Sequence, residues 1–173
     1  MAETPANSIA LAVEHARQSL ANSAAVRAWM GVANSSLALA RIYRAALPPP
    51  TSNAAGYTLA EITAYRPFII VSTIDFGRKR DSSIGYESSG TLVLDFEQTV
   101  ASGIAGDPGE IITQFENDLG AIIDDLCANS DTAGYLQVQD VALHDLIERT
   151  DPDKVTLEGD AIRAILRVEW RGL

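Results

Sequence analysis

Cysteine and histidine, which most often bind metals or form disulfides, are nearly missing from this sequence. It contains one cysteine, Cys127, and two histidines, His15 and His144. A single cysteine cannot form a disulfide within the chain or build a cysteine-rich metal site. The histidines lie far apart and outside the HxH and HExxH patterns that bring two imidazoles to one ion. The sequence therefore predicts no metal centre.

Long apolar runs are missing as well. No stretch approaches the ~20 residues that a membrane-spanning helix requires. The first residues, MAETPANSIALAVEHARQ, lack the basic region of a signal peptide, and Glu14, His15 and Arg17 interrupt their apolar content. We therefore expect no signal peptide, no membrane partner and synthesis in a cytoplasm.

Basic residues are scarce: 13 lysines and arginines stand against 23 acids, for a net charge of −10. The imbalance is uneven, because residues 1–86 hold eight basic and five acidic residues, whereas residues 87–173 hold five and eighteen. If the two halves form separate surfaces, copies of the chain can attract one another. If the fold mixes the halves, no face is polarised, and the sequence leaves both possibilities open.

Two helices are predicted in residues 8–30. Ser8 is expected to cap the first and Ser23 to begin the second, because a serine hydroxyl accepts hydrogen bonds from the free amides of a helix start. Three- and four-residue spacing places apolar residues on the inner faces: Ile9, Val13, Ala16 and Leu20, then Val26, Trp29 and Met30. The second helix is expected to end at Gly31.

The following segment is expected to be less regular. Ile42 and Tyr43 suit a short strand, and three prolines at 48–50 stop regular structure because they lack a backbone donor. Residues 51–65 show no clear period and are interpreted as an irregular loop or arm, with at most one helical turn at 59–62.

A long β-hairpin is predicted at residues 66–100. Residues 66–76 are rich in β-branched and aromatic side chains, and residues 88–100 alternate apolar and polar positions. The predicted inward residues are Phe68, Ile70, Ile74 and Phe76 in one strand and Leu92, Leu94 and Phe96 in the other. Residues 77–87 are left as a connecting loop, longer than the roughly two to five residues usual in hairpins.

The remaining chain predicts one helix and two strands. The helix at 108–128 has a capping residue in Asp107 and a proline at its first position, and Ile111, Phe115, Leu119, Ile122 and Leu126 line one face. Residues 136–173 hold a strand at 136–147, a polar turn at 149–158, and a closing strand with inward Ile162, Ala164, Leu166, Val168 and Trp170. This order predicts a single α+β domain with a mainly antiparallel sheet and helices packed on one face.

No motif for catalysis is present. The sequence has no GxSxG elbow, no dinucleotide pattern, and no lysine in the glycine-containing stretch SGIAGDPGE that would make it a phosphate loop. Asp124 and Asp125 are adjacent on a helix, so they point about 100° apart and fit a solvated face better than one metal ion. Cys127 is interpreted as a core thiol. We expect no enzyme activity and no cofactor.

The cations Arg78, Lys79 and Arg80, here called the basic triplet, stand out within this acidic chain. They fit a nucleic-acid contact, a contact with an acidic protein surface, or a solvated turn. No aromatic residue interleaves them to stack on bases, and the net charge of the chain repels a polyanion. Protein contact is therefore favoured over DNA contact.

Six segments of the sequence occur in an order that resembles that of a known protein family. A helical region ends near Trp29, and ARIYRAALPPP, RPFIIV and SGTLVLDFE come next. An amphipathic helix at 111–126 and a final strand ending VEWRGL close the chain. In this order the chain resembles the tail completion or tail terminator proteins of long-tailed bacteriophages, over most of its length.

The resemblance implies a non-enzymatic ring, commonly a hexamer, at the head–tail junction of a virion assembled in the host cytoplasm. Such a ring ends the tail tube, joins it to the head connector and lets genomic DNA pass. In such a ring the basic triplet is expected to contact protein or the DNA channel. Because Trp170 shares a face of the closing strand with Val168 and Leu166, we expect it in the core or at a subunit contact. Two alternatives remain: another neck ring of the head-completion or stopper type, and a small cytoplasmic nucleic-acid-binding protein that uses the triplet.

Overall fold

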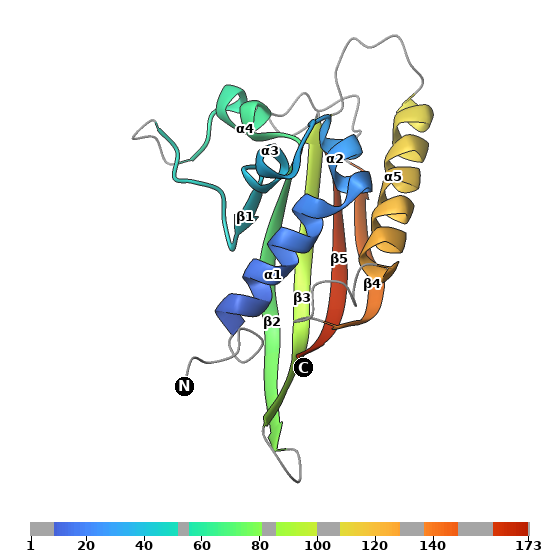
Figure 1. Ribbon diagram of the computed structural model, residues 1–173. Helices are drawn as coiled ribbons and strands as arrows, with labels where there is room; N and C mark the ends of the chain where they lie inside the picture. Colours follow the sequence, from blue (N-terminus) through green and yellow to red (C-terminus); the bar gives the residue numbers. More distant parts are fainter. Residues whose placement is uncertain are drawn as a thin grey trace.

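A five-stranded sheet forms the centre of the computed structural model (Figure 1), which describes residues 9–51, 56–80, 86–99, 108–128, 137–148 and 161–172. The strands are β1 (Ile42–Arg44), β2 (Phe68–Arg80), β3 (Tyr86–Thr99), β4 (Gln137–Glu148) and β5 (Ala161–Gly172). They lie in the order β1-β2-β3-β5-β4, and only the β1–β2 pair is parallel. The predicted α+β class with a mainly antiparallel sheet is therefore confirmed.

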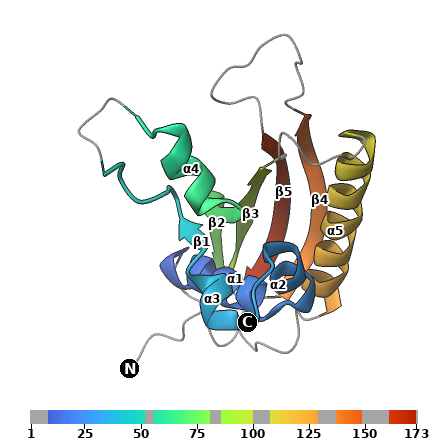
Figure 2. The same cartoon turned by 90° about the horizontal axis from the view of Figure 1, so that it is seen from above.

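Helices cover one face of this sheet. They are α1 (Ile9–Asn22), α2 (Ala24–Met30), α3 (Ser35–Leu39) and α5 (Pro108–Ala128), whereas α4 (Leu59–Tyr65) lies on the other face, beside β1. Figure 2 shows α1, α2 and α5 along the same side, with α5 beside β4 and α4 beside β1. In the part of the chain that the structure describes, no helix is both long and apolar enough to cross a bilayer.

The short helices depend on side-chain caps. Ser23 Oγ accepts a 3.1 Å hydrogen bond from Val26 N, and Gly31 ends α2 with a φ of 64°, so both predicted ends are confirmed. The sequence analysis missed α3, which Asn34 caps by accepting a 3.0 Å bond from Leu37 N. Five residues are too few to show a helical period. The predicted caps Ser8 and Asp107, and the polar turn at 149–158, lie outside the described residues.

The helix α4 occupies the last seven residues of the segment 51–65 that was interpreted as an irregular loop or arm. Thr58 and Glu61 form a capping box in which each side chain bonds the backbone amide of the other residue. The helix then continues to Tyr65, beyond the single turn that was expected. Its Tyr65 ring lies 5.9 Å from the Tyr43 ring, on the face of β1 opposite the buried Ile42.

The core lies between the sheet and α1, α2 and α5. It contains the predicted inward residues of β3 and β5 and most of those predicted for the helices: Val13, Ala16, Leu20, Val26, Trp29, Met30, Leu92, Leu94, Phe96, Phe115, Leu119, Ile122, Leu126, Ile162, Ala164, Leu166, Val168 and Trp170. Ile9 is an exception, because it is 41% exposed at the start of α1.

The predicted face of β2 is wrong. Ile69 and Val71 are the buried core residues, and a register irregularity between Thr73 and Asp75 then changes which residues face the core. As a result Ile74 is 55% exposed, whereas Phe76 packs on the core. Such a bulge inserts an extra residue and reverses the alternation beyond it. Phe68 is also buried, but on the other face, where its ring lies 6.3 Å from that of Tyr43.

The hairpin is longer than predicted and its loop is shorter. Regular pairing of β2 with β3 continues through Arg78↔Ser88, Lys79↔Glu87 and Arg80↔Tyr86. The basic triplet therefore belongs to a strand, not to a loop at 77–87 as expected. Only residues 81–85, outside the described part, connect the two strands.

Candidate interaction surface

The end of the β2–β3 hairpin projects beyond the rest of the sheet. The described part of β5 ends at Gly172, which pairs with Ser88. Beyond this point the backbones of Lys79 and Arg80 pair only with β3 in the described structure. Figure 1 shows this two-stranded ribbon reaching past the helices. The triplet is thus held on a regular, two-stranded arm.

The face of β2, β3 and β5 that points away from α1, α2 and α5 is here called the open face. It mixes half-buried apolar residues with charged ones: Ile70, Asp75, Val93, Asp95, Glu97, Arg163, Ile165, Arg167, Glu169 and Arg171. The register places Ile70, Asp95 and Ile165 in one row across three strands. Asp95 thus lies between the two isoleucines, and the face alternates apolar and charged positions across its middle.

Two ion pairs organise one end of the open face. Arg163 binds both carboxylate oxygens of Asp95, with Nε donating to Oδ1 at 2.7 Å, and Arg66 Nε donates to Glu97 Oε1 at 2.7 Å. A two-bond contact of this kind fixes the guanidinium plane as well as its position. These arginines therefore hold neighbouring elements together and are poor candidates for binding a phosphate.

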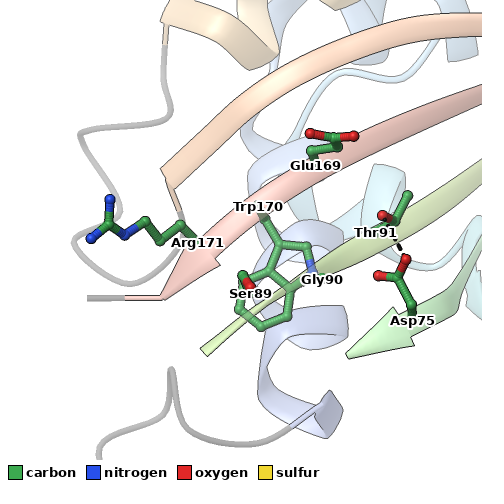
Figure 3. Close-up of a pocket in the computed structure, with 7 residues that line it drawn as sticks. All are labelled: Asp75, Ser89, Gly90, Thr91, Glu169, Trp170 and Arg171. Atoms are coloured by element: carbon green, nitrogen blue, oxygen red, sulfur yellow. Dashed lines mark hydrogen bonds between the residues drawn. The ribbon is translucent and has the colours of Figure 1, made fainter. Parts of the chain in front are cut away.

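A shallow depression of about 270 Å³ lies at the other end of the open face (Figure 3). Its lining includes Asp75, Thr91, Glu169 and Arg171, and the Thr91 hydroxyl donates a 3.2 Å hydrogen bond to Asp75 Oδ2. Among the described residues, no group of three or more histidine, cysteine or acidic side chains could hold a metal ion. The depression makes this end of the open face concave.

Trp170 lies in the core. It is 1% exposed, on the helix-covered side of β5, and its ring lies 6.1 Å from that of Phe76 across the intervening Gly90. Of the two predicted places for this residue, the core is the one observed, and its ring does not form part of the subunit surface.

Two predictions for the end of α5 are wrong. Cys127 is exposed and is not a core thiol. Asp125 does not lie on a solvated face, because it accepts bonds from Ser23 Oγ at 2.7 Å and Ala25 N at 3.1 Å. These bonds lower the pKa of Asp125. Its carboxylate sits at the positive N-terminus of α2, a contact between distant segments that the sequence pattern does not indicate.

Glu61 fixes the connection before β2. Its carboxylate accepts bonds from the backbone amides of Thr58 at 2.8 Å and Thr51 at 2.9 Å, and from both threonine hydroxyls. These bonds stabilise the charged form and lower the pKa of Glu61 to about 2.

We expect the Glu61 carboxyl to titrate near pH 2 in the folded chain. A depressed pKa means that its stabilising contribution is present above the ordinary value of 4.5 and is lost as the pH falls through about 2. Carbon-13 NMR of the glutamate carboxyls measures this directly. In Thr58→Ala the midpoint should rise, because one donor to the carboxylate is removed. An ordinary midpoint in the wild type would contradict the bonding described.

No protein-family model matches the chain, and no curated protein matches it either.

Proposed function

We propose that this chain is a structural protein of a long-tailed bacteriophage that forms a homo-oligomeric ring, a hexamer, at the head–tail junction. The ring ends the tail tube and joins it to the head connector, while DNA passes through its lumen. The proposal starts from the sequence resemblance, and the observation that carries it further is the projecting β2–β3 arm with the basic triplet.

A projecting arm suits a protein that must hold two stacked partners. Two paired strands keep the triplet at a fixed distance from the sheet, because each backbone position is bonded to its neighbour. Three cations at such a point complement an acidic protein surface. The arm extends far enough from the sheet to contact the tail tube or a neighbouring ring. A monomeric nucleic-acid-binding protein of net charge −10 would instead be repelled by its ligand.

The proposal is tested by adding the purified full chain to tails made without it. We expect ring-shaped particles at one tail end by negative-stain microscopy, and tails that then join heads. Binding of rings to heads but not to tails would favour the head-completion alternative. A monomer that ignores tails and binds DNA in a salt-sensitive way would overturn the proposal in favour of nucleic-acid binding.

Replacing Arg78, Lys79 and Arg80 together by serine should abolish tail completion without unfolding the chain. The change removes the positive charge at the arm but leaves the backbone pairing that defines it. Circular dichroism checks the fold, and the number of completed tails is the readout. The matched control replaces Arg78 and Arg80 by lysine, which keeps the positive charge of the arm and should leave tail completion normal. Normal tails with slowed DNA ejection would place the triplet in the channel.

A further inference from the structure

The two edges of the sheet are formed by segments of opposite charge. The strand order places β1 at one edge of the sheet and β4 at the other. Residues 9–51, which include β1 and α1, hold four arginines and one glutamate. Together α5 and β4 hold eight acids and no lysine or arginine. Figure 2 shows β1 at one edge of the sheet and β4 with α5 at the other, so these two edges differ in charge, although α2 lies beside α5.

The positive edge, here called the β1 end, consists of Arg17, Arg41, Arg44 and the exposed Leu37. Arg17 Nε donates a 2.8 Å bond to the Ile42 carbonyl, which places its guanidinium beside β1. Its Nη1 also forms a 2.7 Å ion pair with Glu14, so three arginines and one acid lie at this end. Arg44 lies in β1 itself and is exposed. Leu37 on the neighbouring α3 is 51% exposed. Arginine is enriched in protein contacts, and an exposed apolar side chain on the same end gains from being covered by a partner.

The negative edge, here called the α5 face, consists of Glu110, Glu116, Gly120, Ala121 and Asp124. All five residues are exposed on the helix, away from the core-facing Phe115 and Ile122. Gly120 and Ala121 have little or no side chain, so the middle of this face is shallow, and acidic residues lie on either side of it. A surface of this shape and charge complements an end that carries arginines and an exposed apolar residue.

Neither sheet edge is suited to joining a second copy by strand addition. β1 has only three residues, and the Arg17 side chain already bonds the Ile42 carbonyl. β4 has twelve residues, but its register shifts twice, between Val138 and Asp140 and between Leu143 and Asp145. Bulges and short length both block edge pairing. A contact between copies must therefore rely on side chains.

We infer that the β1 end of one copy binds the α5 face of the next. The two surfaces differ, so the contact is heterologous, and each copy keeps one of each free for a further copy. Repeating this contact from copy to copy builds a chain of subunits. That the chain of subunits closes into a ring rests on the proposed function. The open face and the arm then remain accessible and can bind the tail tube and the head connector.

A charge-exchange cycle tests the contact. We expect Asp124→Arg and Arg44→Asp each to abolish self-association of the full chain at about 0.1 M salt, and the double variant to restore it. The control Glu169→Arg makes the same charge change on the exposed open face and should leave association unchanged. Raising the salt to about 1 M, where screening shortens from about 10 Å to about 3 Å, should weaken the wild-type contact. Multi-angle light scattering gives the masses.

Cross-linking tests the geometry. Cys127 is exposed one turn after Asp124, and it is the sole cysteine of the sequence. With Arg44→Cys added, a short bismaleimide should give a ladder of dimers, trimers and larger species on a denaturing gel. Neither the wild type nor Arg44→Cys combined with Cys127→Ser should cross-link, because each then has a cysteine at one edge only.

The outcomes separate this inference from the proposed function. If neither charge reversal affects the ring, the inference is wrong but the ring proposal stands. The same holds if either single-cysteine protein gives cross-linked dimers. A monomer at every concentration would also overturn the inference. A cross-linked ladder from a chain that never binds tails would support the inference and reject the proposed function.

Discussion

Trp170→Ala is expected to lower the free energy of unfolding by about 3–5 kcal/mol, the usual cost of truncating a buried tryptophan. Trp170 is the largest fully buried side chain, and it joins the Phe76 ring to the end of β5. In a chain of this length the melting temperature should fall by roughly 6–20 °C. Denaturant unfolding followed by circular dichroism measures the loss.

Trp170→Phe is the matched control. The indole nitrogen of Trp170 has no hydrogen-bond partner among the described residues, so a phenyl ring loses volume but no hydrogen bond. We expect a clearly smaller loss than for alanine. Trp29 differs, because its Nε1 donates a 2.7 Å bond to Gln98, and Trp29→Phe should lose that bond as well. Equal stability of Trp170→Ala and the wild type would contradict the burial of this residue.

Gly90→Ala should destabilise the fold by roughly 1–3 kcal/mol, which is typical of an overpacked interior. An added Cβ would lie 2.5 Å from the Asp75 carbonyl oxygen and 3.2 Å from Trp170 Nε1. The first contact is with backbone, so a strand must shift to relieve it. The same unfolding experiment measures the effect.

Gly120→Ala makes the same chemical change with the opposite expected sign. Gly120 is exposed in α5 and has no neighbouring atom within 4 Å of the new methyl group. Alanine should stabilise the helix by about 0.5–1 kcal/mol, because glycine loses more backbone freedom on folding. If both glycine variants shifted stability in the same direction, the close approach of β2 to β3 at Gly90 would be wrong.

The sequence was sufficient wherever the signal is local. Ser23 and Gly31 mark the ends of α2, because a cap involves only neighbouring residues. β3 and β5 alternate between apolar and polar positions except at Val93 and Ile165, so their buried faces follow from a two-residue period. The α5 side chains from Phe115 to Leu126 follow from the helical period in the same way. These elements together fixed the fold class.

Tertiary structure decided the elements whose local signal is ambiguous. FIIV at the start of β2 is apolar on both faces, so alternation could not identify Ile69 and Val71 as the core residues. The irregularity before Asp75 then changes the face, and no local pattern marks it. The basic triplet was assigned to a loop because polar residues lack a strand signal, whereas pairing with β3 extends β2 through Arg80.

The candidate interface shows the same division. The sequence alone determined how much charge each half carries and that a basic triplet is present. It could not determine whether the halves form separate surfaces, because that depends on strand order. The order β1-β2-β3-β5-β4 places the basic strand β1 and the acidic strand β4 at opposite edges, and so turns part of the charge difference along the sequence into one across the sheet. Strand order is set by long-range pairing and packing, which no local pattern of residues encodes.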